Sequence, residues 1–371
     1  MSFKSSLLKS TDAFVGPLFC GLLSRSQTQA EHRRIQDIDA PVLVIRPGGI
    51  GDAVMLLPML QALQKSLPNR PIDILCESRN IDIFRLARPD SKVIAFDKNP
   101  LGALSTLRHA GYGCVIDTEQ FHHFSGVMTA LTRAPLCIGF KINTRRRGLY
   151  THLVSYDLDG PEDVQFGRLL AAACGRVVTL PPRVGILASA SLPDITQDLP
   201  FRETFLLIHA GGSIACKRCP PETLASIAQT IFAEFQMKTV LVGNTEDIPY
   251  AESIARTAGT CTLDLCGHLT LAKTAALCRR AIALLGPDSG IAHLAVALGT
   301  PAVVLFGPSD PAKWGPPPGC GEAIRTPLPC SPCSIFGYTK PCVNPECISG
   351  ITEDQVLESL RRTLSKRINE K

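Results

Sequence analysis

The sequence predicts an α/β fold in which two Rossmann-like domains face each other across a cleft. Its 371 residues exceed the size at which a single hydrophobic core stops growing, about 250–300 residues. Strand-like apolar runs alternate with helix-like runs, stop at a stretch rich in Pro, Gly and Asp over 155–200, and then start again. Such alternation is typical of a parallel sheet covered by helices. We therefore expect one sheet on each side of a linker near 190–202.

The elements follow from apolar runs and the residues that end them. In the first series, strands are predicted at 41–47, 71–77, 91–97 and 113–119, and helices at 53–67, 80–87 and 123–133. In the second series, strands are predicted at 205–212, 238–244, 261–267, 282–288 and 301–307, and helices at 221–235, 247–259, 271–281 and 290–299. The predicted domains are an N-terminal segment (1–40), a first domain (41–195), a second domain (196–350) and a C-terminal helix (351–371).

Composition restricts the class of partner. With 45% hydrophobic and 19% charged residues, the chain has the make-up of a soluble globular protein. Its formal net charge of +5 suits an acidic substrate or an anionic membrane surface. The densest basic cluster is only Arg145 to Arg147, so no basic stripe of the kind found in nucleic-acid binders is present in the sequence. No run reaches the roughly 18 apolar residues of a membrane span.

The N-terminal segment has an apolar core flanked by Lys4, Lys9 and Arg25, in "FKSSLLKSTDAFVGPLFCGLLSR". It lacks a convincing small-residue cleavage site, which argues against a signal peptide. We expect an amphipathic segment that lies on a membrane surface, with a plainly docked helix as the alternative. The chain is therefore expected to stay in the cytoplasm, associated peripherally with the membrane.

The first glycine turn lies in "VIRPGGIGDAVMLLP" and carries an acid, Asp52. As a dinucleotide fingerprint it would lack the third glycine, and a carboxylate in the first helical turn would repel a pyrophosphate. Two interpretations of Asp52 remain open. It can stabilise the helix N-terminus as an acid there commonly does, or it can act as a general base at the strand tip.

The second glycine turn, "HAGGSIACKRCPPE", joins a strand to a helix through Gly212, Ser213 and Lys217. Backbone N–H groups, a hydroxyl and a cation are what an anion-binding loop needs. The ending of a P-loop is missing, and a solvated basic loop is the alternative.

A third turn, in "LLGPDSGIAHLAVALGTP", ends a strand and starts a helix at once. The backbone N–H groups of Ser289, Gly290 and Ile291 are expected to point into the cleft and contact the same diphosphate. Asp288 can cap the turn, and His293 lies on the first helical turn.

These three motifs, in this order, resemble those of glycosyltransferase family nine, the ADP-heptose:lipopolysaccharide heptosyltransferases, over about residues 41–365. The resemblance implies the GT-B fold. It puts the base on Asp52, with Gly49 and Gly51 on the acceptor side. It also implies a donor site, and the residues it assigns to that site are Gly212, Ser213, Lys217, Glu246, Asp288, Ser289, Gly290, Ile291 and His293. The chain departs from the family at Cys219, where the loop usually has Trp, and in the extension over residues 1–40.

The resemblance implies an inverting, metal-independent transfer of heptose from ADP-heptose to the inner core of lipopolysaccharide. The implied partners are a nucleotide-sugar donor, a lipid-linked glycan acceptor and the inner-membrane surface, and neither a cofactor nor a nucleic acid is expected. Two alternatives stay open. One is a transferase of the same fold with another donor or acceptor, and the other is a nucleotide-binding or scaffold protein that has lost activity.

The 15 cysteines are scattered mostly in apolar runs, which favours buried free thiols in a reducing compartment. A tighter group comprises Cys330, Cys333, Cys342 and Cys347. Four cysteines within a short segment could hold a structural zinc ion, but their spacing differs from two Cys-x2-Cys pairs. Free or redox-active thiols are the alternative.

Overall fold

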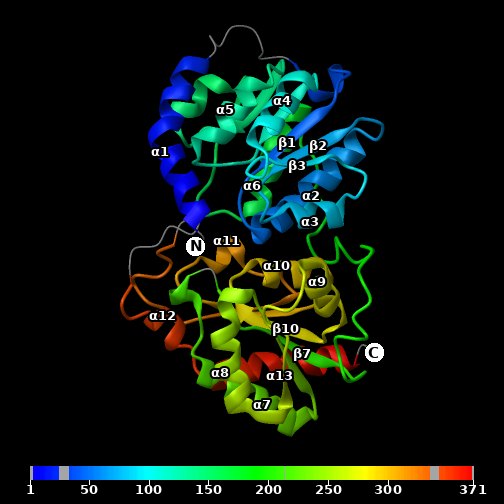
Figure 1. Cartoon of the computed structure of the whole chain (residues 1–371), viewed down its shortest axis with the longest axis vertical. Helices are drawn as coiled ribbons and strands as arrows, with labels where there is room; N and C mark the ends of the chain where they lie inside the picture. The colour runs from blue at the N-terminus through cyan, green and yellow to red at the C-terminus, as the bar shows by residue number, and fades with distance from the viewer. Residues whose placement is uncertain (1–2, 25–32, 213, 335–341, 370–371) are drawn as a thin grey trace. The chain divides into compact units, whose positions relative to one another are not determined.

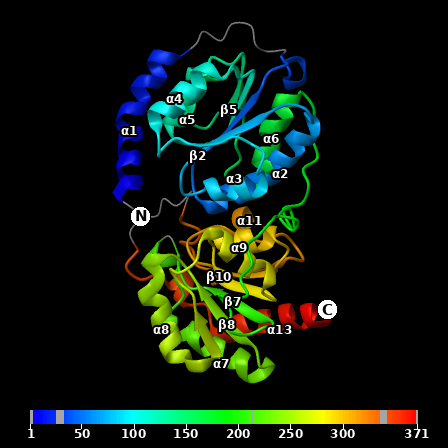
Figure 2. The same cartoon turned by 45° about the vertical axis from the view of Figure 1, so that its right-hand side comes forward.

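The computed structural model of the chain describes residues 3–24, 33–212, 214–334 and 342–369, with the backbone alone for residues 3–9. The chain forms two compact units, residues 1–182 and 183–371, which Figures 1 and 2 show in two views. Each unit contains one six-stranded sheet. The predicted fold class of two Rossmann-like domains is therefore confirmed.

The sheet of the first unit is parallel throughout, with the strand order β3-β2-β1-β4-β5-β6. Its strands are β1 (Val42–Arg46), β2 (Ile72–Cys76), β3 (Val93–Ala95), β4 (Cys114–Asp117), β5 (Leu136–Phe140) and β6 (His152–Val154). All residues of β1, β4 and β5 are buried. Strands covered on both faces read as continuous apolar runs. Strands β1 and β4 were predicted from such runs, whereas β5 was missed.

Helices cover both faces of this sheet. They are α2 (Ile50–Ser66), α3 (Ile81–Ala87), α4 (Pro100–His109), α5 (His123–Leu131) and α6 (Glu162–Cys174). Short 3-10 turns lie before β1 at Ile35–Asp37 (η1) and between β5 and β6 at Thr144–Leu149 (η2). Contacts link α2 with α3 and α6, and α4 with α5, and Figure 2 shows these two groups on opposite faces of the sheet.

The N-terminal helix α1 (Phe3–Leu23) packs lengthwise on α5 and on η2 (Figure 1). Gly16 allows a close approach, since a Cβ there would lie 2.4 Å from the Cβ of His123. Buried Asp12 accepts hydrogen bonds from the backbone N–H groups of His123 (2.9 Å) and Phe124 (2.6 Å). A side chain of α1 thus caps the N-terminus of α5. Within the described residues, no helix is long and apolar enough to cross a bilayer.

The second unit repeats the plan, with the strand order β12-β11-β10-β7-β8-β9 and parallel pairing throughout. Its strands are β7 (Phe205–His209), β8 (Lys238–Val242), β9 (Thr262–Asp264), β10 (Ala283–Pro287), β11 (Ala302–Phe306) and β12 (Gly321–Arg325). Its helices are α7 (Pro221–Phe235), α8 (Ile248–Ala258), α9 (Leu271–Arg280), α10 (Gly290–Ala297), α11 (Pro311–Trp314), α12 (Glu346–Ser349) and α13 (Glu353–Asn369). Short 3-10 turns lie at Ala215–Lys217 (η3), Thr245–Asp247 (η4) and Gly259–Cys261 (η5).

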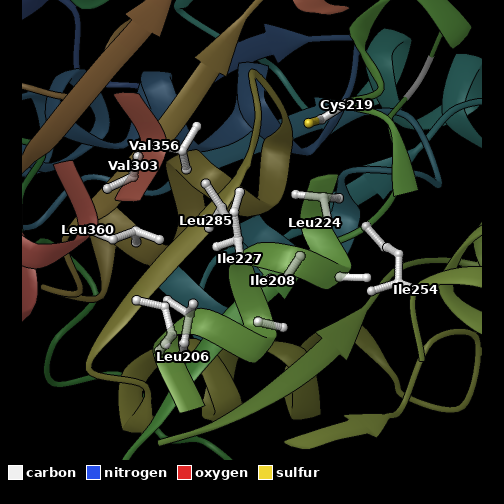
Figure 3. Close-up of a cluster of buried hydrophobic side chains, with 14 of the residues drawn as sticks. Leu206, Ile208, Cys219, Leu224, Ile227, Ile254, Leu285, Val303, Val356 and Leu360 are labelled. Atoms are coloured by element: carbon white, nitrogen blue, oxygen red, sulfur yellow. The ribbon is translucent and has the colours of Figure 1, made fainter. Parts of the chain in front are cut away.

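The main core of the second unit lies between its sheet and the helices α7, α8 and α13. Side chains from strands and helices meet there, as Figure 3 shows for Leu206, Ile208, Leu224, Ile254 and Leu360. The C-terminal helix α13 contributes Val356, Leu360 and Leu364 to this cluster. The predicted helix at 351–367 is therefore part of the second unit.

The stretch expected to hold the linker lies inside the second unit. The backbone N–H groups of Gly185 and Leu187 donate to the carbonyls of Val296 (3.1 Å) and Ala297 (2.8 Å) at the end of α10. Leu187, Ile195 and Leu199 are buried. These contacts place the division between the two units at residues 182 and 183.

Candidate active site

The order of strands marks one point in each sheet where a ligand is expected. In each sheet, successive strands are first added on one side of the first strand and then on its other side. The order therefore switches between β1 and β4 in one sheet and between β7 and β10 in the other. Parallel α/β sheets bind ligands beyond the carboxyl ends of the strands at such a switch point. The loop after β1 leads to Asp52, the loop after β7 contains Lys217, and the turn after β10 contains Asp288.

Asp52 lies in the first turn of α2, with both carboxylate oxygens hydrogen-bonded. Its Oδ2 accepts from the backbone N–H of Gly49 at 2.7 Å, and its Oδ1 accepts from Nη2 of Arg46 at 2.5 Å. Gly48 has φ +125°, and a Cβ there would lie 2.6 Å from Oδ2, so only glycine fits this turn. The Asp52 side chain keeps 29% of its exposure. It therefore stabilises the helix start and also faces solvent.

On the second unit, Lys217 reaches from η3 to the turn after β10. Its Nζ lies 2.6 Å from Oδ2 of Asp288 and donates to the Asp288 carbonyl at 3.3 Å. Burial alone would raise the pKa of the Asp288 carboxyl, but Lys217 and His293 outweigh it and hold this pKa well below its usual range. The ammonium of Lys217 is thus fixed beside the N-terminus of α10.

The prediction that Asp288 caps the turn is wrong. The cap of α10 is Ser289, whose Oγ accepts from the backbone N–H of Ala292 at 3.3 Å. The carboxylate of Asp288 instead lies between Lys217 and Nε2 of His293, which is 3.5 Å away. A cation close in space but distant in sequence competes successfully for a buried carboxylate.

The N-terminus of α10 combines several groups that favour an anion. The first N–H groups of a helix, here including Gly290 and Ile291, have no acceptor within the helix, and the helix dipole adds positive potential there. His293 lies behind this turn and is buried, and burial lowers its pKa. The structure therefore brings together Lys217, Asp288, Ser289 and His293, four of the residues that the resemblance assigns to the donor site.

The remaining donor-side residues are less tightly grouped. Gly212 accepts at its carbonyl from the guanidinium of Arg218, with Nη2 at 3.2 Å. Glu246 lies in η4 after β8 and is exposed, and its backbone N–H donates to Asn244 Oδ1 at 2.6 Å. Ser213, predicted as a phosphate ligand, lies outside the described residues. Cys219 is 3% exposed and packs into the core beneath the loop (Figure 3).

Three polar residues of these loops were not singled out from the sequence. Arg46 is buried at the end of β1, and buried Asp247 pairs with Arg218 at 2.9 Å. His209 ends β7, and its Nδ1 lies 3.0 Å from Oγ of Ser289. Burial lowers the pKa of His209 to about 4. Their positions were the only sign in the sequence that these residues belong to the site. Arg46 and His209 each come at the end of an apolar strand run, and Asp247 lies in the loop after one.

None of the 15 cysteines, all of which lie in the described part of the chain, forms a disulfide bond, and most are buried. Cys330, Cys333 and Cys342 are exposed, whereas Cys347 is buried. In the part of the chain that the structure describes, no group of three or more His, Cys, Asp or Glu side chains is placed to hold a metal ion. The zinc site thus stays a prediction of the sequence, without support from the described residues.

Comparison with known proteins gives one family. The family model described as "Glycosyltransferase family 9 (heptosyltransferase)" matches residues 103–342, which is more than half of the chain. Lipopolysaccharide heptosyltransferase 3 of Escherichia coli is 22% identical over 286 residues, covering 72% of this chain and 83% of that protein. Its counterpart in Escherichia coli strain K12 is 23% identical over 291 residues, covering 72% and 82%.

Solved structures agree on the fold. Escherichia coli ADP-heptose lps heptosyltransferase II superposes with a TM-score of 0.71 at 20% identity, covering 88% of this chain and 99% of that one. Escherichia coli heptosyltransferase WaaC with ADP superposes with a TM-score of 0.70 at 18% identity, covering 87% and 99%. The two parallel sheets, their strand order and the family model that matches residues 103–342 lead to one conclusion: the chain belongs to glycosyltransferase family 9, the heptosyltransferases, and is a glycosyltransferase with the GT-B fold.

Proposed function

We propose that this protein transfers heptose from ADP-heptose to the inner core of lipopolysaccharide with inversion at the anomeric carbon, using Asp52 as the general base. The observation that supports this most is that the two switch points carry side chains of opposite charge. The first holds a partly exposed carboxylate, Asp52, and the second holds an ammonium, Lys217, beside a helix N-terminus.

The proposed reaction is a single displacement. Asp52 takes the proton of the acceptor hydroxyl as the hydroxyl oxygen forms a bond to C1 of the heptose. The bond from C1 to the phosphate oxygen breaks, and its electron pair leaves with ADP. Attack opposite to the leaving group inverts C1. Lys217 and the N–H groups of α10 are proposed to stabilise the negative charge that develops on the diphosphate.

Charge on the donor side suits a diphosphate without requiring a metal ion. Lys217 is already held in place by Asp288, so binding costs little side-chain ordering. The WaaC structures of Escherichia coli contain ADP and ADP-2-deoxy-2-fluoro heptose, which supports an adenine nucleotide as the donor here. We therefore expect ADP to bind equally in Mg²⁺ and in EDTA.

Titration calorimetry with ADP, UDP, GDP and CMP tests the donor. We expect ADP to bind tightest. Transfer is measured separately, as the release of ADP from ADP-heptose with heptose-free lipopolysaccharide as the acceptor. Preference for another nucleotide would favour a transferase of the same fold with a different donor. ADP binding with no transfer to any core acceptor would favour the inactive nucleotide-binding protein.

We also propose that the first unit docks on the inner-membrane surface through α1, where a lipid-linked acceptor would be found. The helix has two faces at four-residue spacing. Asp12, Gly16 and Cys20 face α5 and are buried. On another face Phe14, Leu18 and Leu22 are 81%, 68% and 80% exposed.

The turn that packs against α1 carries basic residues. The 3-10 turn η2 contacts α1 and carries Arg145, which is exposed, and Arg147, which is half-buried. Arg146 is fully buried and pairs with Asp117 at 2.6 Å, so it supports the turn from inside. Exposed apolar side chains and arginines on the same unit are what binding to anionic lipid requires. Peripheral attachment from the cytoplasm is therefore the proposed location.

A further inference from the structure

Arg46 connects the two loops that flank the switch point of the first sheet. It is the last residue of β1, and its Nη1 donates to the carbonyl of Thr118 at 2.8 Å and to Oε1 of Gln120 at 3.4 Å, both after β4. Its Nη2 donates to Asp52 at the start of α2. One side chain thus fixes the spacing between the β1 loop, the β4 loop and the first turn of α2.

The guanidinium of Arg46 is almost fully buried. Only 2% of the Arg46 side chain is exposed, and the guanidinium lies 5.0 Å from the ring centroid of Phe166. Within the described residues, its Nε has no hydrogen-bond partner. Burying a cation this deeply costs several kcal/mol unless a carboxylate compensates it. Asp52 supplies that carboxylate, so the buried charge of Arg46 depends on this contact while its Nε donor stays unsatisfied.

The contact with Asp52 goes beyond a helix cap. Capping requires one acceptor for a free N–H group, and the bond from Gly49 to Oδ2 already supplies it. The bond from Arg46 to Oδ1 adds a second anchor on the other oxygen. Anchors on both oxygens stop the carboxylate from rotating, and each oxygen keeps a lone pair for another donor.

The geometry points to Arg46 as a positioning residue: we propose that it holds the Asp52 carboxylate in the orientation that accepts the proton of the acceptor hydroxyl. This rests on the proposed role of Asp52 as the base. Arg46 touches neither substrate in this proposal, and its effect on transfer passes entirely through Asp52. Arginine suits the task, because its planar fork keeps Nη1 on the β4 loop while Nη2 reaches Asp52, and lysine cannot make both contacts in fixed geometry.

Arg46→Lys in the full-length protein tests the proposal, because it keeps the charge and removes the fork. We expect kcat for transfer to fall about 10- to 100-fold, as misplacement of a catalytic group does, with KM for the donor unchanged. Repeating the change in the Asp52→Asn background should give no further loss of kcat, since nothing is left for Arg46 to position. Equal losses in both backgrounds would mean a structural role and overturn the proposal, as would full activity of Arg46→Lys.

Arg70→Lys is the matched control. Arg70 precedes β2, at the opposite edge of the same sheet, and donates to the carbonyl of Ile35 at 2.5 Å. This substitution removes an arginine fork from the same unit and should leave kcat intact. Failure of the proposed function can be told apart from failure of the proposal for Arg46. Near-normal turnover by Asp52→Asn alone would show that Asp52 is not the base, whatever the result for Arg46→Lys. A melting temperature for each variant shows that the comparison is between folded proteins.

Discussion

The ammonium of Lys217 lies 2.6 Å from the Asp288 carboxylate, although 71 residues separate the two in the chain. Strands β7 and β10 are neighbours in the sheet, so the loops after them meet at one edge. The pair is almost fully buried, with side-chain exposures of 12% and 8%. This relationship, rather than either loop alone, defines the candidate donor site.

Lys217→Ala should weaken ADP binding by about 1.5–3 kcal/mol, the usual effect of losing a charge-assisted hydrogen bond. It should also lower the melting temperature, because it leaves Asp288 buried without its cation. Calorimetry and thermal unfolding measure the two effects. Lys273→Ala is the control, since Lys273 pairs with Asp198 at 2.9 Å in the same unit and should leave ADP affinity unchanged. Unaltered ADP affinity in Lys217→Ala would remove this lysine from the site.

Asp52→Asn separates the base from the helix cap. The amide oxygen can still accept from Gly49 but cannot take a proton, so transfer should fall by roughly 10²–10⁴ while ADP binding stays the same. If Asp52 is only a cap, Asp52→Ala should cost about 0.5–2 kcal/mol of stability and retain activity per folded molecule. Initial rates of ADP release, normalised to folded protein, distinguish the two cases.

His209 predicts a pH dependence of stability. Its pKa falls from 6.5 to about 4 because the ring is buried, with the charge of Asp247 opposing and that of Arg218 assisting. In the unfolded chain the imidazole of His209 therefore binds a proton as the pH falls below 6.5. In the folded protein it binds this proton only near pH 4. The stabilisation is complete above pH 6.5 and is lost as the pH falls through this window, by on the order of 3 kcal/mol.

Chemical denaturation of the native protein and of His209→Gln between pH 4 and pH 7 measures this contribution. We expect the free energy of unfolding of the variant to depend less steeply on pH across the window. Parallel curves for the two proteins would contradict the assignment to His209 and leave the effect to other groups such as His293.

The exposed face of α1 predicts binding to anionic lipid. The triple substitution of Phe14, Leu18 and Leu22 by serine should leave the fold intact, because these side chains are mostly exposed. It should abolish co-sedimentation with phosphatidylglycerol vesicles. The control replaces Leu101 and Val177, 80% and 87% exposed on the same unit, and should sediment like the native chain. Pelleting of the triple variant would show that α1 is only a docked helix.

Vesicle binding should also respond to charge. Replacing Arg145 and Arg147 by glutamate should weaken it most at low salt, because screening already reduces the attraction at high salt. Point variants suit this test better than truncation. Deleting α1 would uncover Val127, Ala130 and Leu149, which pack with Cys20, and would remove the cap that Asp12 provides for α5.

The sequence by itself determined most of the secondary structure and the order of the three motifs. The run from β1 through the glycine turn to α2 was readable, because a fully buried strand is uniformly apolar and glycine marks the turn. Strands β5, β6 and β12 and helices α4, α11 and α12 escaped prediction, and so did helix α6. The helix lies within the stretch rich in Pro, Gly and Asp, although its buried Phe166, Leu169 and Leu170 have helical spacing.

Only the tertiary structure decided which partner each polar side chain takes. Asp288 was expected to cap its own helix but pairs with Lys217, and Arg46, read as part of a strand, anchors Asp52. Local pattern encodes the hydrogen bonding of the backbone, which connects near neighbours in the chain. A charged side chain instead pairs with whatever the strand order brings within about 3 Å, and that order depends on how the whole sheet packs.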